Sequence, residues 1–597
     1  MKETTRKKVL SLLGRFVPSV KNAHYSLKSM AGEALGDSMN VWQEHPRPQL
    51  KRASWTSLNG RWELNGHSIR IPFPPQSTLS GYRGTTGSHM TYTRTFTMPE
   101  PAAGIRTLLH FEAVDQVAEV FLNGQLLGRH AGGYLPFSFD ISDVLCPETE
   151  NTLTVKVTDT LSPVYPYGKQ KTKRGGMWYI PVSGIWNSVW LEQVPDTYIK
   201  TLKLTPDLDG IHISCTTSRP EHNAPVTISI TLSNGEVHRF TMTGKRGYIR
   251  LRGLITADGT PYTPSLWTPE QPFLYHMTLT LGNDTVETYS ALRTIGIETR
   301  NGIQRVCLNG KPIFLHGVLD QGYFCDGIFL PAEEQEFERD ILRMKELGFN
   351  MLRKHIKIEP ECFYYYCDLH GMLVVQDMVN SGRYSFLRDT ALPTIGLRKA
   401  DDTSRPFPEQ QKRFWEQHMK DTLSHLYNHP SIIVYTLFNE GWGQFDSDRM
   451  YTTARKLDAT RLYDSTSGWF AQKQNDFDSR HVYFGNRKPQ PDKRPLFISE
   501  FGGCAYAVPG HHYAKYASYG YGSCKKVEEV TKKVWEAYQK TILPVIGAGC
   551  CGSVYTQLSD VEDEINGFYT YDRKVCKVSI QEMQKLRSEI NKKFCSF

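Results

Sequence analysis

The stretch Ser431–Asp446, SIIVYTLFNEGWGQFD, decides the fold of this chain. Its apolar run, Ile432 to Phe438, is typical of a strand buried on both faces, and such strands belong to parallel sheets that helices cover. The run ends abruptly in Asn439 and Glu440. In a barrel of parallel strands the reacting side chains stand at the C-terminal ends of the strands. The stretch therefore predicts that Asn439 and Glu440 lie at the mouth of a barrel.

The surrounding region, residues 299–597, alternates apolar positions at helical spacing with short apolar runs, which is the pattern of βα units. Eight runs predict strands, namely IFLH, NMLR, MLVVQ, IIVYTLF, RLYDST, HVYF, LFISE and GSVYTQ. Helices are predicted at Pro331–Leu347, Glu359–Leu369, Gln411–Tyr427 and Val527–Ile542. Eight such units close naturally into a (β/α)8 TIM barrel.

The region before the barrel lacks helical periodicity and is rich in short alternating runs, such as NTLTVKV and VTISITL, separated by turn residues. A break near Val194 to Thr197 divides it into two β-sandwich domains, residues 41–195 and 196–298. Residues 1–40 are expected to form an N-terminal extension. A chain of 597 residues is long enough for this multidomain β plus α/β organisation.

The composition excludes several classes of function. A hydrophobic content of 39% and a charged content of 22% are ordinary for a soluble globular protein. The formal net charge is +8, but no basic block is interleaved with aromatic residues, so a nucleic-acid partner is not expected. We find no apolar span long enough for a membrane helix and no clear leader with a cleavage site, which predicts a cytoplasmic protein without a membrane partner.

The twelve cysteines form no CxxC motif. The pairs Cys362 and Cys367, and Cys550 and Cys551, have no accompanying metal-ligand pattern. We therefore expect buried, reduced thiols and no metal site.

A second glutamate follows the same logic as Glu440. The run PLFISEFGG places Glu500 at the end of the seventh predicted strand, opposite the fourth strand across the barrel mouth. Two facing carboxylates are what glycosidic cleavage requires, because one must be protonated to act on the leaving oxygen while the other is ionised. A separation of about 5 Å indicates retention of the anomeric configuration, and roughly 6.5 Å or more indicates inversion.

Other strand ends carry polar or aromatic groups that are suited to holding a sugar. Trp442 and Tyr483 are candidates for stacking on the apolar face of the ring, whereas His481 is expected to be structural rather than catalytic. The remaining candidate substrate-binding residues are Asp320, Arg353, His355, Asp377, Tyr555 and Gln557.

Several segments together resemble glycoside hydrolase family 2, which includes β-galactosidases, β-glucuronidases and β-mannosidases. SLNGRWEL, FEAVDQVAEVFLNGQLLG and PVSGIWNSVWLE are similar to its N-terminal jelly-roll sugar-binding domain. LWTPEQPFLY and LNGKPIFLHGV resemble the end of its immunoglobulin-like domain and the start of its barrel. LFNEGWG and ISEFGG resemble its two catalytic-glutamate motifs, and the resemblance extends from about Trp42 to Lys577.

The resemblance implies a role for each matching residue. Glu440 would be the acid/base, and the preceding Asn439 would bond to the substrate's 2-hydroxyl. Glu500 would be the nucleophile that forms a covalent glycosyl-enzyme, and Tyr483 would hydrogen-bond to it. Retention of configuration follows from the same resemblance.

The sequence departs from the family patterns that distinguish the sugars. Glucuronidases of the family carry an Asn-x-Lys pair for the substrate carboxylate before a TRDRK-like segment, whereas this chain reads EINGFYTYDRK, with Glu564 and Asn566 at those places. Because a carboxylate would face a carboxylate, a glucuronide is disfavoured. LRKHIKIEPE has neither the Ser-His-Tyr of galactosidases nor the Trp-Gly-Gly of mannosidases, while LVVQDM is closer to the mannosidase pattern.

We therefore expect a retaining exo-β-glycosidase for terminal neutral glycosides, with galactose as the sugar. The alternatives within the family are a β-glucuronidase and a β-mannosidase. An alternative of another class is a catalytically inactive carbohydrate-binding protein, which the presence of both Glu440 and Glu500 disfavours. No cofactor is expected, and magnesium or sodium is implied only by some relatives. A homo-oligomer is compatible with the family.

Overall fold

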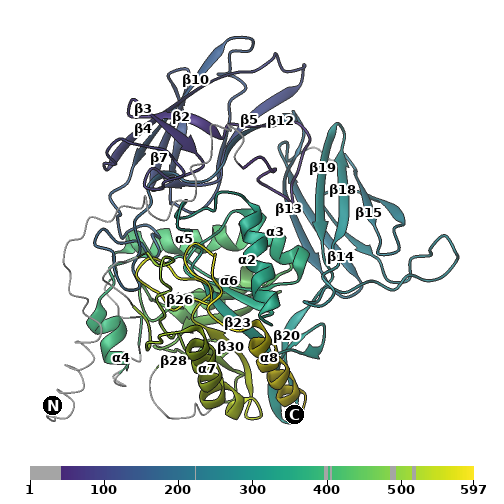
Figure 1. Ribbon diagram of the computed structural model, residues 1–597. Coiled ribbons are helices and arrows are strands. Elements are labelled where there is room, and N and C mark those ends of the chain that lie inside the picture. The colour runs from purple at the N-terminus through teal and green to yellow at the C-terminus, as the bar shows by residue number, and fades with distance from the viewer. Residues whose placement is uncertain are drawn as a thin grey trace.

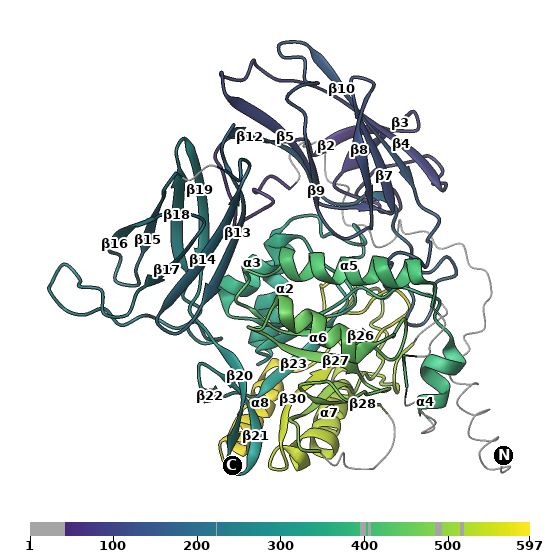
Figure 2. The same ribbon diagram turned by 180° about the vertical axis from the view of Figure 1, so that it is seen from behind.

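The computed structural model describes residues 42–221, 224–394, 401–403, 407–483, 492–513 and 519–596. The N-terminal extension expected for residues 1–40 lies outside them. Two β-sandwiches stand above and beside a barrel of parallel strands, with the first sandwich at the top of the view in Figure 1 and the second at its right. Figure 2 shows the same three bodies from behind.

The first sandwich packs a six-stranded antiparallel sheet, in the order β3-β2-β4-β10-β7-β8, against a four-stranded sheet, in the order β1-β12-β5-β9, and β11 pairs with β6. In β10 (Glu150–Thr158) alternate side chains are buried, because the sequence alternates polar and apolar residues and only one face of the sheet meets the core. The other strands are β1 (Trp55–Ser57), β2 (Gly60–Leu64), β3 (His67–Ile71), β4 (His89–Thr97), β5 (Ile105–Phe111), β6 (Val114–Asp115), β7 (Val117–Leu122), β8 (Gln125–Ala131), β9 (Phe137–Asp140), β11 (Gly184–Ile185) and β12 (Val189–Pro195).

The second sandwich packs a three-stranded sheet, in the order β13-β14-β17, against a four-stranded sheet, in the order β16-β15-β18-β19. Its strands are β13 (Ile199–Pro206), β14 (Gly210–Thr217), β15 (Val226–Thr231), β16 (Val237–Met242), β17 (Arg246–Arg250), β18 (Tyr275–Leu281) and β19 (Asp284–Ser290). A small sheet then leads into the barrel, formed by β20 (Ile295–Arg300), β21 (Ile303–Leu308) and β22 (Lys311–Pro312).

The barrel is one eight-stranded sheet in the order β27-β26-β25-β24-β23-β30-β29-β28, and the pairings between neighbours are parallel. Among the described residues no backbone pairing joins β27 to β28, so the barrel is nearly closed. The strands are β23 (Leu315–Asp320), β24 (Met351–Lys354), β25 (Leu373–Asp377), β26 (Ile432–Asn439), β27 (Leu462–Ser467), β28 (Asp478–Val482), β29 (Leu496–Phe501) and β30 (Cys550–Tyr555), and they confirm all eight predicted strands.

Helices cover the outside of this barrel in both ribbon views. All four predicted helices are present with shifted ends, and α6 and α8 were not predicted. In the described part of the chain, the connections after β27 and β28 contain no helix. The helical elements are α2 (Gln335–Glu346), α3 (Glu361–His370), η2 (Leu387–Ala391), α4 (Leu392–Thr394), α5 (Glu409–His425), α6 (Ser447–Leu457), α7 (Val527–Ala537), η3 (Tyr538–Ile542), η4 (Leu543–Val545) and α8 (Ile580–Cys595).

Two hydrophobic clusters separate the inside of the barrel from its outer layer. Leu319, Met351 and Val375 belong to the cluster inside the barrel, whereas Val318 and Leu352 pack toward the helices. Side chains alternate between the two sides along a strand, so these residues show which polar side chains near the strand ends point inward.

A loop of the first sandwich reaches the barrel mouth. Between β10 and β11, the Tyr167 N–H donates to the Asn380 carbonyl at 3.0 Å, and its hydroxyl donates to the Gly382 carbonyl at 2.8 Å. Farther along, Arg174 pairs with Glu562 at 3.1 Å. The first sandwich therefore builds part of the barrel's upper surface.

The prediction of buried, reduced cysteines is wrong in part. Cys504 and Cys524 form a disulfide, because the loop after β29 brings together two residues that are 20 positions apart, which no spacing motif announces. The other ten cysteines are free, but Cys146 and Cys595 are exposed.

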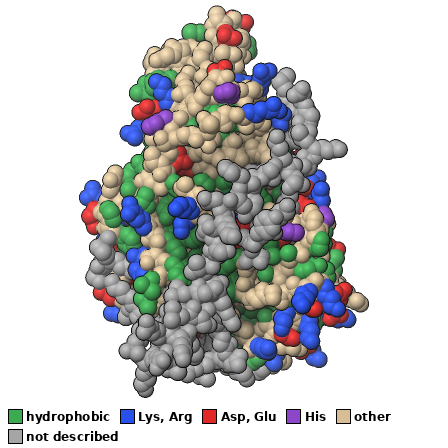
Figure 3. Space-filling view, turned by 60° about the vertical axis from the view of Figure 1, so that its left-hand side comes forward, with side chains coloured by type: hydrophobic (Ala, Val, Ile, Leu, Met, Phe, Trp, Pro, Cys, Tyr) green, Lys and Arg blue, Asp and Glu red, His purple; other side chains and the backbone are tan. Residues whose placement is uncertain are grey.

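Two surface properties bear on the excluded classes. On the described part of the face in Figure 3, lysine and arginine side chains are mixed with acidic ones. Over the described ranges, no helix is both long and apolar enough to cross a membrane.

Candidate active site

The ends of β26 and β29 bring Glu440 and Glu500 together. One carboxylate oxygen of Glu440, one of Glu500 and one ring nitrogen of His481 all lie within 4.8 Å of one another. Glu440 follows β26 with a φ of 51°, and its N–H donates to the Ser467 carbonyl at 3.0 Å. At the next residue, Gly441, an added Cβ would lie 2.2 Å from the Phe470 ring. The opening motif therefore needs a glycine after its carboxylate.

Arg353 organises the floor of this site. Its guanidinium is fully buried and donates to Glu500 Oε1 at 3.0 Å, Asp377 Oδ1 at 3.0 Å and Asn439 Oδ1 at 2.9 Å. A fourth bond goes to the Ser499 carbonyl at 2.9 Å. These contacts use the planar fork of arginine donors, so Arg353 orients three predicted site residues without itself being exposed.

The surroundings of Glu500 favour its ionised form. Burial alone would raise the pKa of this carboxyl, but His481, Arg353 and His355, together with the hydrogen bond from Tyr483, lower it to about 2. The Tyr483 hydroxyl donates to Glu500 Oε2 at 2.6 Å, and its ring stacks on Tyr521 with centroids 3.7 Å apart. An ionised, hydrogen-bonded carboxylate of this kind is suited to nucleophilic attack.

His355 and Asp377 complete one wall. The Nδ1 atom of His355 lies 2.7 Å from Asp377 Oδ2, and both side chains are buried. Burial and the nearby Lys169 lower the pKa of His355. The predicted residues Asn439, Arg353, His355, Asp377 and Tyr483 thus belong to one network with Glu500.

Trp442 lies at the junction with the first sandwich rather than in this network. Its indole N–H donates to the Gly382 carbonyl at 2.7 Å, and its ring packs edge-on against Trp178 at 5.0 Å between centroids. The side chain is 3% exposed. Trp442 therefore holds the loop of the first sandwich, and sugar stacking on its ring stays a prediction.

Three other predicted residues do not meet the two glutamates directly, and the parity of the strands explains two of them. Asp320 points outward and pairs with Lys354 at 2.5 Å. Tyr555 also points outward and packs between Phe501 and Phe568. Gln557 is buried and donates to Asn566 Oδ1 at 2.9 Å. Sugar binding by Asp320, Tyr555 and Gln557 stays a prediction.

His481 is the main residue that the sequence interpretation undervalued. Its Nδ1 lies 2.9 Å from Glu440 Oε1, and its Nε2 lies 3.5 Å from Glu500 Oε1. The side chain is fully buried. The available signal was its position two residues before Tyr483 on one strand, which puts both side chains on the same face.

A third carboxyl, Glu564, lies near the pair. It accepts from the Tyr179 hydroxyl at 2.5 Å and from Asn566 Nδ2 at 3.1 Å. Burial raises the pKa of Glu564, Lys169 opposes the shift, and Glu500 adds to it. Tyr179 and Lys169 come from the first sandwich, so two domains contribute to this part of the site.

The donor set does not fit magnesium. In the described chain, Glu440, His481 and Glu500 are the one group whose ligand atoms are close enough for an ion. Magnesium prefers an octahedron of oxygen ligands, whereas this group offers an imidazole and two carboxylates already bonded to protein partners.

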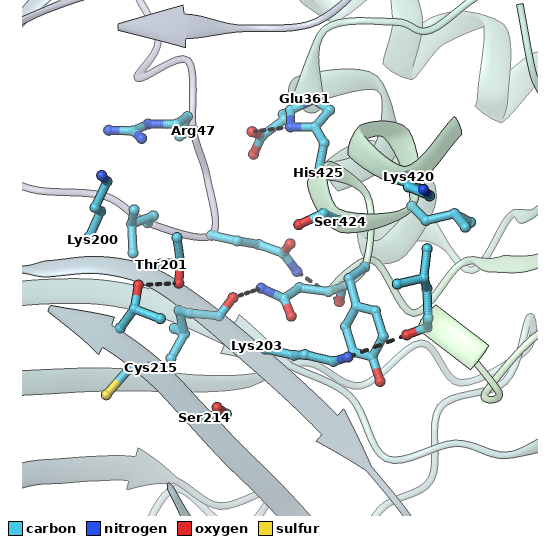
Figure 4. Close-up of a pocket in the computed structure, with 18 residues that line it drawn as sticks. Arg47, Lys200, Thr201, Lys203, Ser214, Cys215, Glu361, Lys420, Ser424 and His425 are labelled. Atoms are coloured by element: carbon cyan, nitrogen blue, oxygen red, sulfur yellow. Dashed lines mark hydrogen bonds and ion pairs between the residues drawn. The ribbon is translucent and has the colours of Figure 1, made fainter. Parts of the chain in front are cut away.

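A separate cavity of about 450 Å³ lies where both sandwiches meet the barrel (Figure 4). Lys200 and Lys203 come from the second sandwich, and Glu361 and His425 come from the barrel helices. None of its lining residues belongs to the network around Glu440 and Glu500. The cavity marks a junction of domains rather than the reaction site.

Glu361 makes this junction sensitive to pH. Burial, reinforced by the charge of Glu112, raises the pKa of Glu361 to about 8. An acid whose folded-state pKa is raised binds more protons when folded, so its contribution to stability falls as pH rises from about 4.5 to about 8. We expect Glu361→Gln to raise the melting temperature at pH 8 by a few degrees, about 2–4 °C per kcal/mol, with little change at pH 5. Thermal melts at both pH values check this, with Glu409→Gln on the exposed start of α5 as the control. Equal shifts at both pH values would contradict it.

Comparison with protein families supports the architecture domain by domain. Residues 75–184 match the glycosyl hydrolase 2 galactose-binding domain-like model, and residues 197–297 match the glycosyl hydrolases family 2 model. Residues 297–591 match the glycosyl hydrolases family 2 TIM barrel domain.

Similar proteins are glycosidases. A β-galactosidase of Priestia megaterium is 25% identical over 448 residues, and one of Thermoanaerobacter pseudethanolicus is 26% identical over 443 residues; each match covers 70% of this chain. The matches span 41% and 54% of those relatives' lengths. A solved β-D-glucuronidase of Dictyoglomus thermophilum shares the fold with a TM-score of 0.70 at 17% identity, covering 92% of this chain and 98% of the other. With all three domains matched and two facing glutamates at the barrel mouth, the chain belongs to glycoside hydrolase family 2.

Proposed function

We propose that this protein is a retaining, exo-acting β-glycosidase that hydrolyses terminal neutral β-glycosides, with β-galactosides preferred. The observation that carries the proposal is the approach of Glu440 and Glu500, whose carboxylate oxygens lie within 4.8 Å of one another. Retaining glycosidases hold their two carboxyl groups about 5 Å apart, whereas inverting enzymes leave room for a water between them.

The two carboxyls divide the chemistry between them. In the first step Glu440 gives its proton to the glycosidic oxygen, which leaves with the bond's electron pair, while Glu500 attacks C1 and forms a glycosyl ester. In the second step water attacks C1, Glu440 takes the water's proton, and the ester bond breaks to restore the Glu500 carboxylate. Tyr483 and Arg353 hold Glu500 in place, and Asn439, fixed through its Oδ1 by Arg353, keeps its amide NH2 for a sugar hydroxyl.

Glu564 supports a neutral sugar. It is buried, near Glu500, and shares its oxygens with Tyr179 and Asn566. A substrate carboxylate beside it would add a like charge in a poorly solvated site, which is unfavourable, whereas a hydroxyl can donate to a carboxylate.

A β-glucuronidase is the second candidate, favoured by one observation. Lys169 lies close enough to His355 and Glu564 to act on their charges, so the site also contains a cation that a substrate carboxylate can pair with. The solved relative named a β-D-glucuronidase has the same fold.

A panel of nitrophenyl glycosides tests the proposal. We expect the highest kcat/KM on a β-galactoside, lower values on the β-mannoside, β-glucoside and α-arabinoside, and the lowest on the β-glucuronide. A product NMR time course should show the β-anomer first, because double displacement retains configuration. Exclusive turnover of the glucuronide would replace the first candidate by the second, and absence of any turnover would support the inactive binding protein.

Glu564→Gln is expected to change the preference between the two sugars. Removing the like charge should raise kcat/KM on the β-glucuronide relative to the β-galactoside by roughly tenfold. Both kcat/KM values are to be measured side by side, with Asp563→Asn as the matched control, because that neighbouring carboxylate is buried against Arg174 instead. A ratio that stays constant, or that moves toward the galactoside, would show that Glu564 does not select against uronates.

A further inference from the structure

The catalytic pair is connected to a buried aspartate by a chain of hydrogen bonds inside the barrel. His481 Nε2 lies 3.0 Å from Ser467 Oγ, and Ser467 Oγ donates to Ser499 Oγ at 3.0 Å. Ser499 Oγ lies 2.8 Å from Ser479 Oγ, which donates to Asp464 Oδ2 at 2.6 Å. Asp464 and the three serines are buried, with exposed fractions of 8% or less.

Asp464, at the far end of this chain of hydrogen bonds, determines which atom is the donor in each bond. Burial raises the pKa of Asp464, while the hydrogen bonds from Ser479 and Asn475 and the charge of Arg353 oppose the rise. In its ionised form Asp464 only accepts hydrogen bonds, and it accepts from Ser479 and, through Oδ1, from Asn475 at 3.0 Å. Each hydroxyl has one hydrogen, so Ser479, having donated to Asp464, accepts from Ser499, whose 2.8 Å contact with Ser479 is shorter than its 3.4 Å contact with the Arg480 carbonyl. Ser499 in turn accepts from Ser467, whose oxygen is then left to accept the hydrogen of His481 Nε2.

The position of Glu500 independently favours a hydrogen on His481 Nε2. Glu500 Oε1 lies 3.5 Å from His481 Nε2, and the donors of Arg353 and Tyr483 on Glu500 favour its ionised form. A lone pair on Nε2 would face that negative charge, whereas an N–H dipole is attracted to it. Arg353 and Tyr483 supply further donors to Glu500, so its ionised state is stabilised even when His481 is neutral.

We propose that this chain of hydrogen bonds fixes His481 as the neutral tautomer with its hydrogen on Nε2, so that the Nδ1 lone pair accepts a hydrogen bond from protonated Glu440. The 2.9 Å contact between Nδ1 and Glu440 Oε1 is then an O–H···N hydrogen bond. This bond keeps Glu440 protonated, so that it can give its proton to the leaving oxygen. His481 is a positioning residue in this scheme, because it acts through Glu440. The inference rests on the proposed glycosidase function.

The other charged and titratable groups around the ring are accounted for. Glu440 comes from the end of β26, Asp464 from β27, Tyr483 from the end of β28 and Glu500 from β29, while Arg353 comes from β24 behind Glu500. The Trp469 ring also packs edge-on against the imidazole, with centroids 5.4 Å apart.

Asp464→Asn tests the direction of the chain. Asn475 donates to Oδ1, so the new amide would present its NH2 to Ser479 and reverse each bond up to His481, placing the ring hydrogen on Nδ1. Nδ1–H would then stabilise ionised Glu440. We expect kcat/KM on an alkyl glycoside to fall by about 10–100-fold and kcat/KM on the 2,4-dinitrophenyl glycoside, whose leaving group needs no proton, to stay within about twofold.

The basic limb of the pH profile should move to lower pH in the same variant, because Glu440 would lose its proton more easily. Ser479→Ala, which interrupts the chain without reversing it, should give a smaller loss with the same dependence on the leaving group. Ser465→Ala is the control, because this buried serine of β27 donates to the Gln474 carbonyl at 2.5 Å and lies outside the chain. Equal losses on both substrates, or an unchanged pH profile in Asp464→Asn, would overturn the inference.

A neutron crystal structure of the wild-type protein at neutral pH decides the tautomer without any substrate. Deuterium on Nε2 and on Glu440 Oε1 would support the inference, and deuterium on Nδ1 would overturn it. A wild-type protein that turns over no glycoside would refute the proposed function instead, so the two failures are distinguishable.

Discussion

Glu500→Gln is expected to lower kcat on every glycoside that the wild-type protein hydrolyses by about 10⁴–10⁶-fold, the range found when a covalent nucleophile is removed. An amide cannot displace the leaving group and form the glycosyl ester. Glutamine has the same shape, so the contacts with Arg353 and Tyr483 keep acceptable geometry and the fold should persist. Initial rates on an activated aryl glycoside, together with a thermal melt, measure both effects.

Chemical rescue makes this prediction specific. Glu500→Gly should regain turnover when azide is added, and the product should be a glycosyl azide of inverted configuration, because the anion attacks C1 from the side of the missing carboxylate. Glu361→Gln is the matched control, since it removes a buried carboxyl in the separate junction cavity and should leave kcat unchanged. Undiminished activity in Glu500→Gln would refute its assignment as the nucleophile.

Arg353→Met is expected to abolish activity and to reduce the free energy of unfolding by about 3–5 kcal/mol, because it leaves Glu500 and Asp377 buried without their cation. The low pKa of Glu500 contributes stability that is present above its unfolded-state value and is lost as pH falls toward 2. Without the guanidinium this carboxyl should take up its proton at higher pH. Denaturant unfolding at pH 7 and pH 5 should therefore show a larger loss at pH 7.

A matched arginine separates this electrostatic effect from simple loss of packing. Arg293 is also buried, but it donates to the carbonyls of Pro430, Thr460 and Ile432 rather than to carboxylates. Arg293→Met should destabilise the protein by a similar amount at both pH values. A pH-independent loss in Arg353→Met as well would contradict the proposed support of Glu500.

The architecture was predictable because its signals are local. Alternation in runs such as NTLTVKV indicates half-buried strands, and uniformly apolar runs such as IIVYTLF indicate strands of a covered parallel sheet. Helix α6 was missed because its sequence, SDRMYTTARKL, has few apolar residues and buries only Met450 and Ala454 among them. The few apolar residues do lie on one face of the helix, so the amphipathic pattern was present but short.

The site was predictable only in part. Position after a strand is enough to find Glu440 and Glu500, but it does not distinguish inward from outward side chains, which is why Asp320 and Tyr555 were included. Knowing the direction of one side chain would have shown the direction of its neighbours, since Arg353 points inward and the next residue, Lys354, must point outward.

The contributions of the first sandwich had no local signal at all. Tyr179 and Glu564 are separated by 385 positions and meet only because the domains dock. The same holds for Lys169, whose influence on His355 and Glu564 depends on the path of a loop. Such pairings are properties of the assembled chain rather than of any segment.

The junction between β27 and β28 is the one place in the described barrel where neighbouring strands are not joined through their backbones. Two side-chain bonds cross it instead, from Ser479 to Asp464 and between Ser467 and His481. The barrel wall is therefore held together at this junction by side-chain hydrogen bonds, which single substitutions can remove. Because both bonds also belong to the hydrogen-bond chain that ends at His481, a substitution there would change the closure of the barrel wall and the surroundings of Glu440 at the same time.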